Sequence, residues 1–330
     1  MAEANDLMPP SIRRANGSVF HYTSAAGLLG LVEGGSLWAS EATSLNDLAE
    51  VRHGWEVVKS WLLQQPPSES AELLSEMAEN PLEQEHEVFV LSGSTAPDDA
   101  NQWRLYAQGG NGYSVEIDPA VRLAAFSDAP EAERVIDDGS GGTTINIAWF
   151  FSENASVSPW YHVMYTVDET ETALRELLAS TAKAISSMKA PGRELDDADR
   201  SEERDVLHGK ALEALGTIAH LTKEPGFSGE NEVRTVATFL AADEHIRYRP
   251  GTHGIIGYGL LCPCPDGHPF GRVFHRPGGI EGSRPAGPLP IRSVRLGPLL
   301  HDEHVSTVRR LLSRNDLGDT DVEFSAVRLR

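Results

Sequence analysis

The chain has 330 residues, with 28 Lys and Arg against 49 Asp and Glu, which gives a formal net charge of −21. At about 150 residues per domain, this length corresponds to about two domains or one large one. Hydrophobic residues make up 40% of the chain and charged residues 23%, a composition typical of folded globular proteins and not of disordered ones. The negative balance excludes a chain-wide basic surface for nucleic acid or anionic membranes.

The charge is unevenly distributed along the chain. Residues 246–330 contain 12 Arg, no Lys and 8 acids, a sum of 12 − 8 = +4, so residues 1–245 carry −21 − 4 = −25. A phosphate-bearing ligand is therefore expected to meet the last third of the chain or a local site.

Three further absences in the sequence limit the class of protein. The acidic N-terminus lacks the basic and apolar regions of a signal peptide, and no apolar run approaches the roughly 20 residues of a membrane helix. Cys262 and Cys264 are too close together for the paired ligands of a zinc site and are poorly spaced for a mutual disulfide. We expect a cytoplasmic protein with no membrane partner and no metal site.

The hydrophobic pattern and the turn residues predict alternating helices and strands. The first third of the chain is expected to contain a strand at 18–23, a helix at 25–32 capped by Ser24 and ended by Gly34 and Gly35, a strand at 36–40, a helix at 45–64, a polar segment or helix at 66–86, a strand at 87–92 and a helix at 100–107. Strands follow at 113–117, 143–151 and 161–167, then helices at 169–188 and 202–222 and a strand at 232–240. The last part is expected to contain a Gly- and Pro-rich loop region at 248–290, a strand at 291–296, a helix at 302–313 and a strand at 322–327.

This alternation favours a single α+β domain over residues 18–330, with a mixed or antiparallel sheet at its core. A helical insertion at 165–222 is expected to interrupt the domain, and residues 1–17 form an N-terminal extension.

The first group of candidate site residues lies at the end of the first strand. It comprises His21, Tyr22 and Thr23. A neutral imidazole can hydrogen-bond a ribose hydroxyl, and a tyrosine ring offers a face for stacking. The alternative is an ordinary strand end whose tyrosine lies in the core.

The second group combines small hydroxyl residues with aromatic ones. Ser92 and Ser94 lie at the end of a strand, where a ligand can approach closely, and Trp103 and Tyr106 lie three residues apart on one helix face. Tyr113 follows after a glycine turn. The alternative is that Trp103 and Tyr106 simply anchor that helix in the core.

The third group is a charged strand. Glu230, Glu232 and Arg234 share one face if the segment is extended, because side chains alternate along a strand. One carboxylate would hydrogen-bond a ribose hydroxyl beside an oxocarbenium-like centre, and the other would orient or deprotonate an acceptor. The alternative is a solvated charged face with weak ion pairs.

Several segments taken together resemble a widespread bacterial family of domains of unknown function, over about residues 20–330. The segments that carry the resemblance are His21–Thr23, Leu37–Trp38, Leu45–Asp47 with Glu50, Val90–Ser94, Gln102–Ala107, Gly112, Lys223 with Phe227, Glu230–Arg234 and Val294–Pro298.

The opening block is the strand that carries His21 and Thr23, the short helix that follows and the break at Gly34 and Gly35. This block also resembles the start of ADP-ribosyltransferases, in particular the DNA-modifying toxins of toxin–antitoxin systems. The resemblance implies a sheet of ADP-ribosyltransferase type and NAD as a substrate. It implies that Glu232 is the catalytic glutamate, that Glu230 directs the acceptor and that Tyr106 or Tyr113 stacks on nicotinamide. The expected NAD contacts are His21, Tyr22, Thr23, Ser92, Ser94, Trp103, Tyr106, Tyr113 and Arg234.

The function that this resemblance implies is ADP-ribosyl transfer by a toxin or antiphage-defence effector. Its acceptor would be a nucleic acid or a protein, and an inhibitory antitoxin or defence protein would be its partner. One alternative is a nuclease-like protein that holds a divalent metal through acidic side chains, with Asp47, Glu50, Glu230 and Glu232 as candidates. The other is an interaction module without catalysis.

Overall fold

The computed structural model describes residues 7–44, 48–79, 88–127, 135–137, 143–145, 154–190, 197–239, 245–251, 254–267, 273–275 and 287–329. The chain divides into two compact units, which we describe separately. The helical unit comprises 1–13, 47–85 and 162–229, and the sheet unit comprises 14–46, 86–161 and 230–330.

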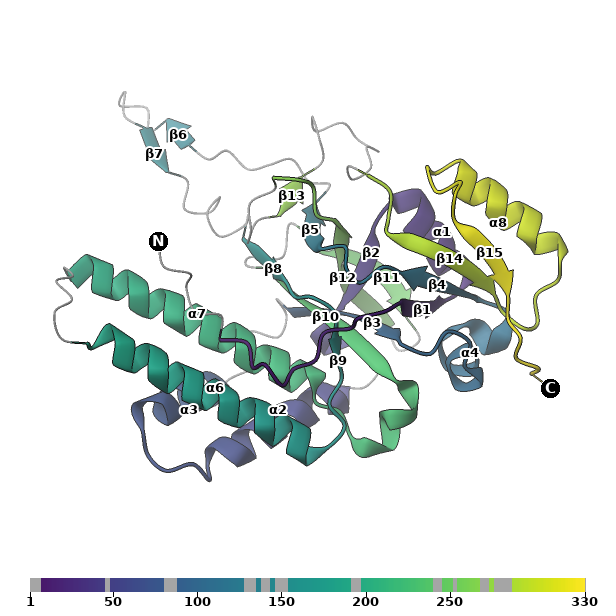
Figure 1. Ribbon diagram of the computed structural model, residues 1–330. Helices are drawn as coiled ribbons and strands as arrows, with labels where there is room; N and C mark the ends of the chain where they lie inside the picture. The colour runs from purple at the N-terminus through teal and green to yellow at the C-terminus, as the bar shows by residue number, and fades with distance from the viewer. Residues whose placement is uncertain are drawn as a thin grey trace. The chain divides into compact units, whose positions relative to one another are not determined.

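Helices dominate the described part of the first unit (Figure 1). They are α2 (Leu48–Leu62), α3 (Glu69–Glu79), α6 (Val167–Met188) and α7 (Asp197–Leu221). Helix α7 packs on α6 and on α2, and α3 packs on α6. Gly54 of α2 lies so close to α7 that a Cβ there would be 2.0 Å from the carbonyl oxygen of Ala219. The helices predicted at 165–222 thus belong to the same unit as α2 and α3.

Local sequence signals define the ends of α6 and the buried face of α7. Thr166 and Glu169 form a capping box in which the Glu169 carboxylate accepts the backbone N–H of Thr166 and the Thr166 hydroxyl accepts that of Glu169. Ala211, Leu215 and Ile218 of α7 are fully buried, as their helical spacing predicts.

The sheet unit contains a large open mixed sheet (Figure 1). Its strands pair in the order β13-β5-β12-β2-β3-β1-β4-β14-β15. In addition, β10 pairs with the edge of β3 opposite β1 and β2, β8 pairs with β10, and β11 pairs with β12. The strands are β1 (Val19–Thr23), β2 (Leu37–Glu41), β3 (Val88–Ser94), β4 (Tyr113–Ile117), β5 (Leu123–Ser127), β8 (Ala155–Val157), β10 (Glu232–Phe239), β11 (Arg247–Gly251), β12 (Gly254–Pro263), β13 (Phe274–His275), β14 (Ile291–Leu296) and β15 (Asp321–Phe324). The pairs β14–β15 and β13–β5 are parallel and the other pairs named here are antiparallel, which confirms an α+β fold with a mixed sheet.

The β1–α1–β2 segment follows its sequence signals closely. Helix α1 (Ala25–Gly34) begins after Ser24, whose hydroxyl accepts the N–H of Gly27 at 3.0 Å. It ends at Gly35, which has a φ of 63° and donates its N–H to Leu31. Trp38 of β2 lies against Gly30, because a Cβ on that glycine would be 2.4 Å from the indole ring.

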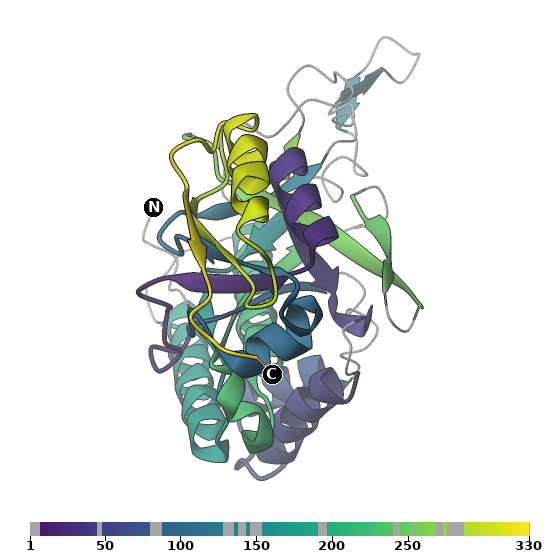
Figure 2. The same ribbon diagram turned by 90° about the vertical axis from the view of Figure 1, so that its right-hand side faces the viewer.

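The main hydrophobic core covers one face of this sheet. Val19, Leu91 and Val233 lie on neighbouring strands of that face. Helices α1 and α8 (Glu303–Ser313), which Figure 2 shows close to each other, contribute buried leucine and valine side chains to the same core. A smaller cluster on the other face contains Phe20 and Tyr22 with helix α4 (Ala100–Tyr106).

Three sequence predictions of secondary structure differ from the structure. The region 248–290 was expected to be loop-rich, but it supplies the ten-residue strand β12 and most of its hairpin partner β11. Glycine serves packing here, because a Cβ at Gly259 would be 2.7 Å from the Phe239 ring. Strands β5, β6 (Val135–Asp137) and β8 were missed. The strand expected at 161–167 is limited to β9 (Tyr161–His162), since the cap of α6 uses the backbone that follows.

Other predicted features fall partly outside the described residues. Of the strand expected at 143–151, only β7 (Thr143–Ile145), which pairs with β6 (Val135–Asp137), is described. None of the described helices combines the length and the hydropathy needed to span a bilayer.

Candidate functional site

Three segments that are distant in the sequence become adjacent strands in the order β1–β3–β10. Phe20 of β1 pairs with Ser94 of β3, and on the other side of β3 Ser94 pairs with Glu232 of β10. Ser92 pairs with Arg234 in the same ladder. The structure therefore brings the first-strand block, the two serines and the charged strand together.

Strand β3 has two different partners on its β1 side. Strand β1 pairs with it at Ser94, near its end, whereas β2 pairs with it at Phe89 and Val90. The two partners therefore diverge along the middle of β3. The His21 ring occupies this part of the β3 edge, where its Nδ1–H donates to the carbonyl oxygen of Ser92 at 3.0 Å.

This hydrogen bond fixes the tautomer of His21. A carbonyl oxygen only accepts, so Nδ1 carries the proton and Nε2 carries the lone pair in the neutral ring. Burial lowers the pKa of His21, the bond to Ser92 opposes that shift, and the positive charge of Arg249 lowers the pKa further. The ring is therefore neutral at pH 7, with Nε2 as a hydrogen-bond acceptor.

Glu232 and Arg234 form a buried ion pair. Their exposed fractions are 8% and 4%. The Arg234 Nε–H donates to Glu232 Oε1 at 2.7 Å and Nη2–H donates to Oε2 at 3.0 Å. This two-point contact keeps the carboxylate ionised and fixes its plane. The solvated charged strand considered as an alternative is therefore wrong at these two positions.

Glu230 lies in a constrained turn just before β10. Its carbonyl oxygen accepts the Ser94 hydroxyl at 2.7 Å and the Gln102 side-chain amide at 3.0 Å. The Tyr106 hydroxyl donates to its carboxylate Oε1 at 2.9 Å. Asn231 then adopts a φ of 48°, in the left-handed region, which accommodates asparagine better than most residues. Helix α4 and strand β3 thus hold the Glu-x-Glu segment.

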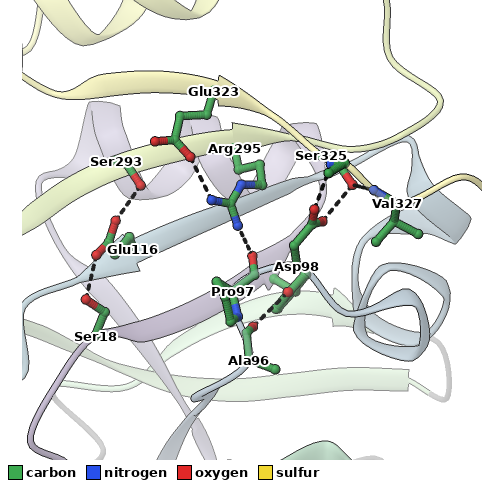
Figure 3. Close-up of polar contacts among 12 residues, drawn as sticks. Ser18, Ala96, Pro97, Asp98, Glu116, Ser293, Arg295, Glu323, Ser325 and Val327 are labelled. Carbon is green, nitrogen blue, oxygen red and sulfur yellow. Dashed lines mark hydrogen bonds and ion pairs between the residues drawn. The ribbon is translucent and has the colours of Figure 1, made fainter.

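Helix α4 is itself fixed by Asp98 and the C-terminal segment (Figure 3). Asp98 Oδ1 accepts the Trp103 indole N–H and the Ser325 hydroxyl, each at 2.6 Å, and Oδ2 accepts the Ala326 N–H at 2.7 Å. Burial opposes ionisation of Asp98, but these hydrogen bonds and the charge of Arg295 hold its pKa below the ordinary value. The C-terminus therefore helps to position Gln102 and Tyr106.

Four of the expected NAD contacts lie in packed positions. Trp103 is fully buried, and its ring meets that of Tyr22 edge to face at 4.9 Å. The Tyr22 hydroxyl donates to Ala96 and accepts the N–H of Asp99, and burial raises the pKa of Tyr22 to about 12. Tyr113 is buried in the main core, and the Thr23 hydroxyl lies against Gly27. These four residues belong to the scaffold, and the core alternative holds for Tyr22 and Trp103 but not for Tyr106, which is 43% exposed.

The remaining candidates lie on two faces of the sheet. Strand alternation directs Ser92, Ser94, Glu232 and Arg234 to one face and His21 to the other, the face of Val19. His21 reaches the β3 edge only because β1 and β2 diverge there. The candidate site is therefore the middle and end of β3 with its flanking strands.

Three residues at the site were not predicted from the sequence. Gln102 and Asp98 lie next to predicted residues in the sequence, and Gln102 could have been found because the segment 102–107 carries part of the family resemblance. Arg249 was assigned to a loop-rich region. For the metal alternative, no group of three His, Cys, Asp or Glu side chains suited to a metal occurs in the described part of the chain. Asp47 and the Glu50 side chain lie outside it.

The comparison with known families concerns this same part of the chain. Residues 102–235 match the family model described as Protein of unknown function (DUF2971). Over these residues, this match confirms the resemblance to a family of unknown function. It covers α4 from Gln102 onward, the Glu-x-Glu turn and the Glu232–Arg234 pair. No curated protein and no solved structure matches the chain.

Proposed function

We propose that the protein is an NAD-dependent ADP-ribosyltransferase with its catalytic centre on β1, β3 and β10. The observation that carries the proposal is that these three strands are adjacent, with the His21 ring bonded to the Ser92 carbonyl at one edge of β3 and Ser92 paired with Arg234 at the other edge. The resemblance of the opening block to ADP-ribosyltransferases assigns roles to the same residues. The proposal includes a sheet of ADP-ribosyltransferase type, in which β1 and β2 pair with different parts of β3 and diverge from each other between them.

His21 would bind a ribose hydroxyl of NAD. Its Nε2 lone pair accepts a hydroxyl proton while Nδ1–H remains bonded to Ser92. The buried environment keeps the ring neutral, so the acceptor remains available at neutral pH.

Glu232 would stabilise the reacting ribose. As the bond between the ribose carbon and nicotinamide breaks, its electron pair leaves with nicotinamide, and the ribose becomes an oxocarbenium ion. The Glu232 carboxylate, oriented by Arg234, accepts the 2′-hydroxyl and opposes this positive charge. The acceptor then attacks the ribose carbon, and the Glu230 carboxylate takes its proton. The acceptor would be a nucleic acid, a protein or water.

The test is release of nicotinamide from NAD, followed by chromatography, with wild-type protein and three variants. Glu232→Gln and Glu230→Gln each remove one carboxylate charge, and Glu303→Gln removes an equivalent charge from an exposed helix as a matched control. We expect Glu232→Gln to lower the rate at least about 100-fold and Glu303→Gln to leave it unchanged. Circular dichroism verifies that each variant is folded.

Three results would contradict the proposal. Folded wild-type protein that releases no nicotinamide, with or without nucleic acid and lysate acceptors, is the first. Equal rates in Glu232→Gln and Glu303→Gln are the second. Calorimetric heat with Mg²⁺ or Mn²⁺ but none with NAD is the third, and it would favour the nuclease-like alternative.

A further inference from the structure

Arg249 belongs to the Arg-rich last third of the chain and has no role in the reaction described above. It lies on β11, and its Nη2–H donates to the Ser40 hydroxyl of β2 at 2.9 Å. Its Nε–H is inaccessible to solvent and has no hydrogen-bond partner among the described residues. The guanidinium is half-buried, and this burial lowers its pKa.

Three other arginines of the sheet unit, which lie on strands as Arg249 does, are paired with carboxylates. The pairs are Arg234–Glu232, Arg292–Asp118 and Arg295–Glu323. Arg249 makes no such ion pair with any described residue. A half-buried positive charge without a counter-ion opposes folding, because desolvation is uncompensated. A group of this kind is typical of a binding site whose ligand supplies the missing charge.

The strand registers put Arg249 on the same face as Glu232. Arg249 pairs with Ile256 of β12, Tyr258 of β12 pairs with Ser40 of β2, and Ser40 pairs with Val90 of β3. Because side chains alternate, the face of Arg249 and Ser40 is that of Ser92 and Glu232.

The distance along this face suits an extended ligand. Ser40 and Glu232 are separated by two strand spacings and four residues of β3, which is about 10 Å across and about 13 Å along the strands. Beside Ser40, the rings of Trp38 and Tyr258 are 4.8 Å apart and add an aromatic surface.

We propose that Arg249, held by Ser40, binds the diphosphate group of a dinucleotide whose ribose lies at Glu232. The planar guanidinium fork matches two phosphate oxygens, and its Nε–H then gains a partner. The identity of the ligand as a dinucleotide rests on the proposed function, whereas the diphosphate site rests on Arg249 itself.

The test is isothermal titration of four probes into wild-type protein and three variants. The probes are NAD, ADP-ribose, inorganic pyrophosphate and nicotinamide riboside, which lacks the diphosphate. Arg249→Gln removes the fork and Arg249→Lys keeps only the charge. Arg309→Gln is the matched control, because it removes the same charge from an exposed position on α8.

We expect Arg249→Gln to weaken ADP-ribose binding by about 10- to 100-fold, with Arg249→Lys intermediate and Arg309→Gln unchanged. Nicotinamide riboside should bind all four proteins equally. Pyrophosphate should raise the melting temperature of the wild type but not that of Arg249→Gln. The unliganded Arg249→Gln variant should melt no lower than the wild type, which distinguishes a binding role from a structural one.

Failure of this inference and failure of the proposed function are distinguishable. Nicotinamide release by the wild type, with equal ADP-ribose affinity in Arg249→Gln and Arg309→Gln, overturns the diphosphate site alone. Pyrophosphate binding that depends on Arg249 in a protein that does not process NAD supports the site and overturns the proposed function. Absence of binding by every phosphate-bearing probe overturns the site.

Discussion

Replacement of Glu232 by glutamine should destabilise the protein as well as impair the proposed catalysis, and the two effects can be separated. Glu232 and Arg234 are 8% and 4% exposed and share two hydrogen bonds. The variant breaks the buried ion pair by removing the Glu232 charge, a change that typically costs 3–5 kcal/mol. Because the glutamine oxygen still accepts one hydrogen bond, we expect a loss of about 3 kcal/mol in the free energy of unfolding.

The partner substitution should reverse much of this loss. Arg234→Met alone leaves the Glu232 carboxylate buried and should cost a similar amount. The double variant, Glu232→Gln with Arg234→Met, contains no buried charge at this position, so we expect a coupling energy of about 2–3 kcal/mol between the two sites. If Glu232 is catalytic, the double variant regains stability but not nicotinamide release.

Urea denaturation of the four proteins measures these free energies, with the slope of each transition as a check that the unfolding transition is comparable. A Glu232→Gln variant within about 1 kcal/mol of the wild type would refute the reasoning from an uncompensated buried charge. Additive losses in the double variant would refute the coupling. Recovery of nicotinamide release together with stability would show that Glu232 acts only through the fold.

Three other outcomes follow from the sheet unit. The stability that Asp98 contributes is fully present above the pKa of its unfolded form, about 3.9, and is lost as the pH falls through its lower folded pKa. The difference in melting temperature between the wild type and Asp98→Asn should therefore shrink below about pH 4. Gly112→Ala places a Cβ 2.3 Å from the Thr23 carbonyl oxygen and should cost about 2–3 kcal/mol in urea denaturation, whereas Gly17→Ala, which has open space, should cost little; equal losses would contradict this. An NMR titration should find His21 with a pKa below 6.5, and a value above 6.5 would exclude the buried neutral ring.

Local signals explain why so many elements were predicted correctly. In α1 the Ser24 cap and the Gly35 end are interactions between residues a few positions apart, so the sequence displays both partners. The capping box of α6 and the buried spacing of α7 are of the same kind. The region 248–290 was different, because Gly259 is required by its packing against Phe239, a residue outside its local sequence.

The candidate site also depends on contacts between residues that are distant in the sequence, so only part of it could be predicted. The residue types at His21, Ser92, Glu230 and Glu232 indicated where polar chemistry was available. Whether an aromatic residue such as Trp103 contacts a ligand or fills the core depends on what packs around it, and the structure makes it scaffold.

By itself, the sequence determined the charge asymmetry, the α+β class and the Glu-x-Glu segment, because these depend on composition and on contacts between near neighbours. Only the tertiary structure decided that β1, β3 and β10 are adjacent and that Glu232 is paired with Arg234 within a buried ladder. It also decided that Arg249 shares their face and that its Nε–H has no partner in the part of the chain that the structure describes. The physical reason is that strand order and register arise from pairing between segments up to some hundreds of residues apart, which no local pattern encodes.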